Sequence, residues 1–395
     1  MSKSSVNHGT QSVWAGELQP FPHGSHTVPI FSTVTFAYDD LQAWHDTSTG
    51  KQPGHIYSRN SNPTVSVLEE KVRVLESAEA ATSFSSGMAA ISNTLFALLK
   101  PGDRVLSIKD SYGGTSKIFL EFLPKFGIDV VLCDTEDHEQ IESEIRKGFK
   151  LVYLESPTNP TLKVIDIQRI ARIAKEFDAI TAVDNTFASP INQNPIELGA
   201  DLVIHSATKY LGGHSDTLCG LVCGSKELVN QIFLFREING ASLHPETAYH
   251  VIRGMKTLEL RVLRQNENAM HISRYLEQHP AVSAVYYPGL ESNTGHTIAK
   301  KQMRGFGGVL SFELKGGYSS VETLLHNLTF LHLAASLGSV STLAGPPRTT
   351  SHVELNEEQR AGLGIPESLV RYSAGIENAE DLIADLDQAL NLIKY

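Results

Sequence analysis

A lysine suited to covalent chemistry stands at the end of a predicted buried strand. The apolar run over 201–206 ends in two hydroxyl residues, Ser206 and Thr208, and Lys209 follows directly. Burial of an ammonium group is costly unless the group is paired or neutral. Such a lysine often has a lowered pKa and can form a Schiff base with a carbonyl compound. From this segment alone, a lysine whose head reaches water is an equally good interpretation.

Residues suited to ring and anion binding follow other predicted strands. The stretch 85–91 opens a helix with small residues that include Gly87 and Met88, and the N–H groups at a helix start attract anions. Tyr112 stands beside two glycines, where its ring could lie flat against another ring. Asp184 ends a buried strand and needs a partner, such as the pyridinium N–H of pyridoxal phosphate. Each feature also has a structural interpretation: a serine-capped helix, a packed turn tyrosine or a helix N-cap.

These features are expected to meet at one site, because ligands of parallel α/β sheets bind at the carboxyl ends of the strands. An anion-binding helix start, a stacking tyrosine, an acid for a ring nitrogen, phosphate-binding hydroxyls and a lysine for an aldehyde favour a pyridoxal 5′-phosphate (PLP) enzyme. The corresponding fold is aspartate-aminotransferase-like (fold type I). The sequence has neither a G-x-G-x-x-G nor a P-loop pattern, which leaves nucleotide binding weakly supported.

The elements that must position these residues alternate along the chain. Short apolar runs and amphipathic helical patterns predict βαβ units and a mostly parallel, seven-stranded sheet covered on both faces. Its strands are expected at 81–85, 104–108, 129–133, 151–155, 180–185, 201–206 and 218–223, after a helix over 65–77. A long charged helix over 256–278 then leads to strands at 282–287, 308–314 and 369–373 and to helices at 320–328 and 379–392. These predict a smaller α+β domain.

We therefore expect three parts: an N-terminal arm (1–61), a PLP-binding domain (62–256) and a C-terminal domain (257–395). The arm has little regular pattern, yet its aromatic and β-branched content is too high for a disordered tail. We expect it to pack against a neighbouring subunit.

Composition narrows the class of protein. The formal charge of −11 argues against a nucleic-acid or anionic-membrane surface. The three cysteines (Cys133, Cys219 and Cys223) are too few for a disulfide framework and are expected to be buried thiols. No zinc-type ligand spacing, signal-peptide pattern or membrane-length apolar run is present, which predicts a metal-free cytoplasmic protein.

Nine short motifs occur in order along nearly the whole chain. They are Tyr57 to Thr64, Ser86 to Ala90, Tyr112 to Thr115, Glu155 to Pro160, Val183 to Phe187, His205 to Tyr210, Arg253 to Leu258, Ser336 to Gly338 and Arg371 to Glu377. The set resembles the Cys/Met-metabolism PLP-dependent family. Its members include cystathionine γ-synthase, cystathionine γ-lyase, methionine γ-lyase and O-acylhomoserine sulfhydrylase.

The resemblance implies a role for each matching residue. Lys209 would be the Schiff-base lysine and proton shuttle, Asp184 would pair with the ring nitrogen, and Tyr112 would stack on the ring and act toward the leaving group. The remaining roles follow the family pattern: phosphate binding by Gly87, Met88, Ser206 and Thr208, contact with a neighbouring subunit's phosphate by Tyr57 and Arg59, and substrate binding by Arg371, Asn159, Ser336 and Tyr57. Members are usually homotetramers built as dimers of dimers.

The sequence departs from the family pattern at three places. Ala335 stands where cystathionine-cleaving relatives carry a glutamate that meets the distal ammonium of the substrate. Gly114 stands where bacterial methionine γ-lyases carry a cysteine. The segment 343–354 is also unusual, and its Arg348 and Glu354 would contact either a nonstandard substrate tail or, as we favour, only solvent.

The leading expectation is γ-elimination from a γ-substituted L-amino acid, with ammonia and a 2-oxobutanoate-type acid as products. The leaving group would be a thiol, as in methionine, or an oxygen-linked group, as in canavanine. The alternative is γ-replacement on an O-activated homoserine. A PLP-binding regulator without turnover is the contrasting hypothesis, and the intact residue set argues against it.

Overall fold

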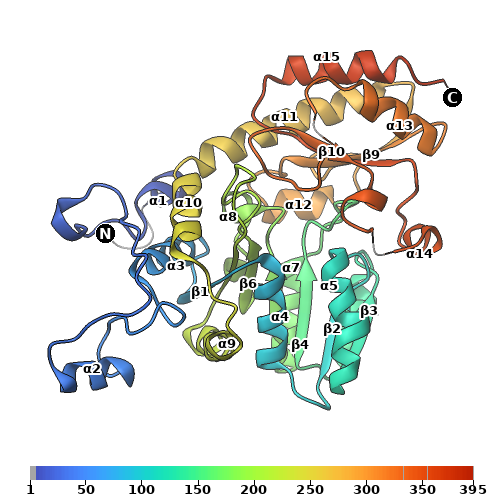
Figure 1. Cartoon of the computed structure of the whole chain (residues 1–395). Coiled ribbons are helices and arrows are strands. Elements are labelled where there is room, and N and C mark those ends of the chain that lie inside the picture. The colour runs from blue at the N-terminus through green and yellow to red at the C-terminus, as the bar shows by residue number, and fades with distance from the viewer. Residues whose placement is uncertain (1–5, 332, 354, 395) are drawn as a thin grey trace.

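A seven-stranded sheet forms the centre of the larger domain (Figure 1). The computed structural model describes residues 6–331, 333–353 and 355–394. The sheet has the order β1-β7-β6-β5-β4-β2-β3. Its strands are β1 (Ala80–Phe84), β2 (Arg104–Ile108), β3 (Asp129–Cys133), β4 (Leu151–Glu155), β5 (Ile180–Asp184), β6 (Leu202–Ser206) and β7 (Gly220–Gly224). Only β7 runs antiparallel to its neighbours, which confirms the predicted α/β fold with a mostly parallel sheet.

Side chains from both faces of this sheet are buried under helices. Along β4, Leu151 and Tyr153 join a core with α4 and α9, whereas Val152 and Leu154 join a core with α6 and α7 on the opposite face. This alternation is the two-residue period of a strand. Continuous apolar runs are therefore needed, and β4 is buried at every position.

The helices lie between the strands in the chain. Those of the arm and the larger domain are α1 (His8–Trp14), α2 (Leu41–Ser48), α3 (Pro63–Leu75), α4 (Gly87–Leu98), α5 (Gly113–Lys117), α6 (His138–Ile145), α7 (Ile167–Glu176), α8 (Ser189–Asn192), α9 (Lys226–Asn239) and α10 (Pro245–Met255). Short 3-10 turns are η1 (Pro22–Gly24), η3 (Leu123–Phe126), η4 (Pro195–Leu198) and η5 (Pro347–Thr349), and η2 (Ile118–Phe122) is a π-helical turn.

One long helix, α11 (Leu258–Gln278), connects the two cores. Leu258 and Val262 pack in the larger domain, while Ile272 and Leu276 pack in the C-terminal domain. That domain has an antiparallel sheet of order β10-β11-β9-β8. Its elements are β8 (Val282–Tyr286), β9 (Val309–Leu314), β10 (Leu343–Gly345), β11 (Leu369–Ser373), α12 (His296–Gln302), α13 (Tyr318–Asn327), α14 (Glu357–Gly362) and α15 (Ala379–Leu390).

The arm differs from the extended segment predicted from sequence, because it contains α1 and α2. Helix α2 lies at the tip of the arm, away from both domains (Figure 1). The base of the arm is held by a buried ion pair in which Lys71 Nζ lies 3.0 Å from Glu17 Oε1. Lys256 Nζ lies 2.6 Å from the second oxygen of Glu17. Removal of one partner from a buried pair is strongly destabilising, so this cluster fixes where the arm leaves the domain.

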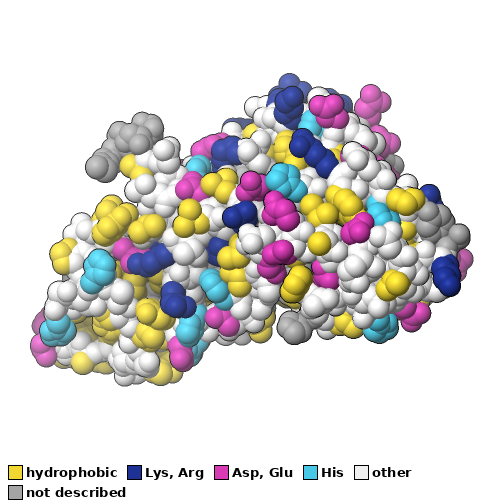
Figure 2. Space-filling model, turned by 90° about the horizontal axis from the view of Figure 1, so that it is seen from above, with side chains coloured by type: hydrophobic (Ala, Val, Ile, Leu, Met, Phe, Trp, Pro, Cys, Tyr) yellow, Lys and Arg dark blue, Asp and Glu magenta, His cyan; other side chains and the backbone are white. Residues whose placement is uncertain are grey.

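Basic and acidic side chains are interspersed on the face shown in Figure 2, with no large basic patch. This agrees with the net charge of −11. No helix in the described part of the chain is long and apolar enough to cross a membrane. All three cysteines are buried and free, as predicted.

Candidate active site

A cavity of about 250 Å³ lies at the carboxyl ends of the large-sheet strands and is closed by residues of the C-terminal domain. All the site residues predicted from sequence line it except Tyr57 and Arg59. Those lining residues are Gly87, Met88, Tyr112, Asn159, Asp184, Ser206, Thr208, Lys209, Ser336 and Arg371. The strand-end argument therefore located one site from residues nearly 300 positions apart.

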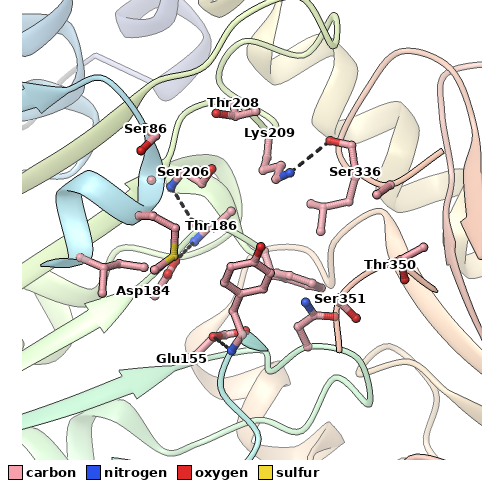
Figure 3. A pocket seen from close by; sticks show the side chains of 18 of the residues that line it. Ser86, Glu155, Asp184, Thr186, Ser206, Thr208, Lys209, Ser336, Thr350 and Ser351 are labelled. Carbon is pink, nitrogen blue, oxygen red and sulfur yellow. Dashed lines mark hydrogen bonds between the residues drawn. The ribbon is translucent and has the colours of Figure 1, made fainter. Parts of the chain in front are cut away.

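Lys209 follows β6 and points across the cavity toward the C-terminal domain (Figure 3). Its Nζ donates a hydrogen bond to Ser336 Oγ at 3.1 Å. Burial, together with the nearby positive charge of Arg371, lowers the pKa of Lys209 to about 8. A substantial fraction of the amine is therefore neutral near physiological pH, which is the nucleophilic and basic form.

Arg371 is held on β11 by oxygen atoms from both domains. Its Nη1 donates to Asn159 Oδ1 at 3.1 Å and its Nη2 donates to the backbone oxygen of Ser336 at 3.0 Å. The side chain is almost fully buried, and burial lowers its pKa to about 10. A buried, oriented guanidinium that faces a cavity is suited to a planar carboxylate.

The start of α4 forms a narrow cradle at one end of the cavity. Ser86 caps the helix by accepting a hydrogen bond from Ala89 N. A Cβ on Gly87 would lie 2.7 Å from Ser206 Cβ, so only glycine permits this approach of α4 to β6. The first N–H groups of a helix have no intrahelical partner and attract an anion. The cradle thus has the shape and polarity of a phosphate site, and Ser206 forms its opposite wall.

Asp184 lies at the end of β5 with its carboxylate held from two sides. Oδ1 accepts the Thr186 N–H at 3.0 Å, and Oδ2 accepts the Tyr153 hydroxyl at 3.2 Å. Burial raises the pKa of Asp184, and the hydrogen bonds from Thr186 oppose that rise. An oriented, desolvated carboxylate in this position is suited to a cationic ring N–H.

Tyr112 precedes α5 and leaves its ring in the mouth of the cavity. Its backbone N–H donates to Glu155 Oε2 at 2.9 Å. The ring passes over Gly114, where a Cβ would lie 2.9 Å from Tyr112 Cε1 and 3.0 Å from Met88 Sδ. A side chain at position 114 would therefore displace the tyrosine ring or Met88.

Tyr57 and Arg59 lie in the arm and do not reach the cavity of their own chain. The Arg59 guanidinium carbon lies 5.2 Å from the centroid of the Tyr57 ring. The Tyr57 side chain is 38% exposed. Within one chain, the structure therefore does not bring these two predicted residues to the site.

The structure adds residues to which the sequence gave no role. Thr186 Oγ1 accepts the Ser206 N–H at 2.8 Å and so fixes β5 against β6 at the cavity floor. Ser86 and Glu155 also line the cavity, as do Thr350 and Ser351 from the C-terminal domain. Ser86 could be found as an N-cap signal, but Thr350 and Ser351 carry no local signal.

The unusual segment 343–354 reaches the cavity through Thr350 and Ser351 rather than through Arg348. Arg348 Nη1 lies 2.6 Å from Glu367 Oε2, and its side chain is 40% exposed. This agrees with the surface interpretation of Arg348. Glu354 lies outside the described residues. Ala335 lines both this cavity and a neighbouring one of about 290 Å³ beside α13.

The donor set fits PLP. The cradle at Gly87 takes a phosphate, Asp184 takes the ring N–H, and Lys209 takes the aldehyde carbon. Each group is placed by its own strand end, and no metal-binding cluster of His, Cys, Asp or Glu occurs among the described residues.

Comparisons with known proteins agree with this assignment. The family model described as Cys/Met metabolism PLP-dependent enzyme matches residues 9–391. An L-methionine gamma-lyase of Fusobacterium nucleatum subsp. polymorphum is 45% identical over 98% of both chains. A cystathionine gamma-lyase of Bacillus subtilis is 43% identical over 94% of this chain and 95% of that protein. The crystal structure of cystathionine gamma synthase from Xanthomonas oryzae pv. oryzae in complex with cystathionine has a TM-score of 0.93 and 37% identity, covering 98% of both chains.

These matches confirm the cofactor and the enzyme class predicted from the sequence. They run through relatives named as lyases and as synthases, which indicates elimination or replacement chemistry on amino acids. The chain belongs to the Cys/Met metabolism PLP-dependent enzyme family.

Proposed function

We propose that the protein catalyses γ-elimination on a γ-substituted L-amino acid and releases ammonia and a 2-oxobutanoate-type acid. The observation that carries this proposal is the placement of Lys209, Ser336 and Arg371 in one cavity, joined by the hydrogen bonds described above. A carboxylate bound at Arg371 presents its α carbon to the Lys209 amine.

The residues divide the work of the reaction. PLP supplies the electron sink that makes loss of the α proton feasible. Arg371, with Asn159 and Ser336, holds the α-carboxylate. Lys209 Nζ removes the α proton and then moves a proton at the β carbon. Tyr112 donates a proton from its hydroxyl to the departing heteroatom, which leaves as a thiol or as an oxygen-linked group.

Asp184 keeps the ring nitrogen protonated, and Gly87, Met88, Ser206 and Thr208 hold the phosphate. Thr208 Oγ1 also accepts the Cys219 N–H at 3.1 Å, which orients its hydroxyl. Tyr57 and Arg59 would reach the phosphate of a neighbouring subunit in a homotetramer, since they lie outside their own cavity. The exposed apolar residues of the arm, such as Trp14 and Trp44, support such an assembly.

Ala335 supports a lyase without a charged distal subsite. A methyl group at this position leaves the active cavity next to the second cavity beside α13. A glutamate that would meet a distal ammonium is absent at this position, which disfavours cystathionine. Methionine and an oxygen-linked substrate such as canavanine both remain compatible with this wall.

Replacement at the γ carbon of an activated homoserine is the second candidate. It is supported by relatives named as cystathionine gamma-synthases, including the chloroplastic enzyme of Arabidopsis thaliana at 42% identity. Both reactions use the same cavity, so the fate of the intermediate distinguishes them.

A substrate panel tests the proposal. Methionine, canavanine, cystathionine and O-acetylhomoserine are each incubated with the holoenzyme, with and without cysteine, and 2-oxo acid and ammonia are measured. We expect equal amounts of both products from methionine or canavanine, with no turnover by Lys209→Ala. If 2-oxo acid forms only slowly and added cysteine diverts the flux to a thioether, the lyase assignment is wrong.

A further inference from the structure

Three carboxyl groups meet at the ends of adjacent strands behind the cavity. Asp110 follows β2, Glu155 ends β4 and Asp184 ends β5, and these strands are neighbours in the sheet. The β4–β5 register places Glu155 directly beside Asp184. All three side chains are buried. Neighbouring buried carboxylates repel, so this arrangement calls for neutralisation of at least one of them.

Two of the three have partners that favour the charged form. Asp110 Oδ2 lies 3.0 Å from Lys163 Nζ, and the Thr135 hydroxyl also donates to Asp110. Asp184 accepts hydrogen bonds from the Thr186 N–H and the Tyr153 hydroxyl, and the charge of His205 favours its ionised form.

Glu155 has only backbone donors in the part of the chain that the structure describes. Its Oε2 accepts the Tyr112 N–H at 2.9 Å, and the Asn159 N–H also lies against this carboxyl group. No cationic side chain forms an ion pair with it among the described residues. Figure 3 shows Glu155 at the base of the cavity, joined to the tyrosine backbone.

We propose that Glu155 is a neutral carboxylic acid that positions Tyr112 and Asn159, and that it leaves the negative charge of the pair on Asp184. Burial, followed by the neighbouring charge of Asp184, raises the pKa of Glu155 well above its ordinary value. A carboxylic acid kept neutral at pH 7 by an apolar site and a nearby charge is chemically reasonable. The groups that set this balance are Asp110 with Lys163, Asp184, Tyr153 and His205.

This role follows from what the two loops carry. Tyr112 and Asn159 stand on separate strand-end loops, and Glu155 contacts the backbone of both. A charged group here would compete with Asp184 for the positive charge of a bound ring. A neutral acid holds the same N–H groups without that competition. The inference rests on the proposed function, which assigns proton donation to Tyr112.

Glu155 variants separate geometry from charge. Glu155→Asp withdraws the carboxyl group by one methylene and should lower kcat about 100-fold with little change in KM, because a shift of about 1 Å in a reacting group has that effect. Glu155→Gln keeps the length and has no charge, so it should restore most of the kcat that Glu155→Asp loses. If Glu155→Gln loses as much kcat as Glu155→Asp, the neutral-acid role is wrong.

Infrared spectroscopy of the holoenzyme reads the proton directly. The difference between wild type and Glu155→Gln at pH 7 should contain the carbonyl stretch of a protonated carboxylic acid. The same difference for Glu227→Gln, an exposed position on α9, should contain carboxylate bands instead. Carboxylate bands from Glu155 would overturn the inference.

Carboxyl-13C glutamate NMR of the wild-type holoenzyme provides the same information if Glu155→Gln does not fold. One glutamate carboxyl should remain protonated at pH 7, and a spectrum in which every glutamate is ionised would refute the proposal. A protonated Glu155 in an enzyme that makes no 2-oxo acid would contradict only the proposed function. An ionised Glu155 in an active lyase would contradict only this inference.

Discussion

Replacement of Arg371 by lysine tests the carboxylate site most sharply, because it keeps the positive charge and removes the planar fork. A guanidinium has five N–H donors, and Asn159 Oδ1 and the Ser336 backbone oxygen each take one of them. The donors that remain can bind both oxygens of a substrate carboxylate. An ammonium has only three donors. If lysine satisfied the same two protein oxygens, one donor would be left for the substrate.

The loss is therefore one charge-assisted hydrogen bond, together with imperfect satisfaction of a buried oxygen. Charge-assisted bonds contribute about 1.5–3 kcal/mol and an unsatisfied buried group costs about 1–3 kcal/mol, so we expect a total of about 2–4 kcal/mol. This corresponds to a fall in kcat/KM of about 30- to 1000-fold. The effect should lie mainly in KM, because the α-carboxylate is bound equally in the ground and transition states.

Steady-state 2-oxo acid release by Arg371→Lys provides the measurement. Arg348→Lys is the matched control, because its exposed ion pair with Glu367 lies outside the cavity and should change kcat/KM by no more than about fivefold. The decarboxylated substrate analogue should bind wild type and Arg371→Lys equally. A kcat/KM for Arg371→Lys that equals that of the control, or a loss confined to kcat, would refute this account of the carboxylate site.

Three further results are expected. Gly87→Ala places a Cβ 2.7 Å from Ser206 Cβ, and an overpacking cost of about 1–3 kcal/mol should weaken PLP binding by about 5- to 150-fold in an equilibrium titration, while the melting curve stays cooperative. Burial lowers the pKa of Lys209 to about 8, so the rate of PLP capture by the apoenzyme should rise with pH as the amine loses its proton and level off above about pH 8; a rise that continues toward about pH 10 would indicate an ordinary lysine. Ala335→Glu should lower kcat/KM for methionine and raise it for cystathionine, whose distal ammonium it can pair with, and unchanged selectivity would show that this wall does not choose the substrate.

The large sheet is predictable from sequence because its strands are runs that must be apolar on both faces. The predicted strands at 104–108, 129–133 and 151–155 match the structure residue for residue. Elements without such a pattern are not predictable. Helix α1 buries only Ser12 among its described residues, and β10 has only three residues, Leu343–Gly345. Such elements form because tertiary contacts hold them, not because of their own periodicity.

The candidate site divides in the same way. Residues at strand ends, such as Asp184 and Lys209, can be placed from sequence because the sheet topology brings those ends together. The relation of Glu155 to Asp184 needs the strand register, which no local pattern encodes. Thr350 and Ser351 enter the cavity from the other domain, and Tyr57 and Arg59 need a second chain, so their places depend on domain and subunit packing.

The central claim is that Lys209 holds the cofactor, and borohydride reduction followed by peptide mass mapping tests it most directly. We predict a single phosphopyridoxyl group on the peptide that contains Lys209, and none on Lys209→Ala treated in the same way. A label on another lysine, such as the buried Lys71 at the base of the arm, or an unlabelled wild-type protein after incubation with PLP, would contradict the account.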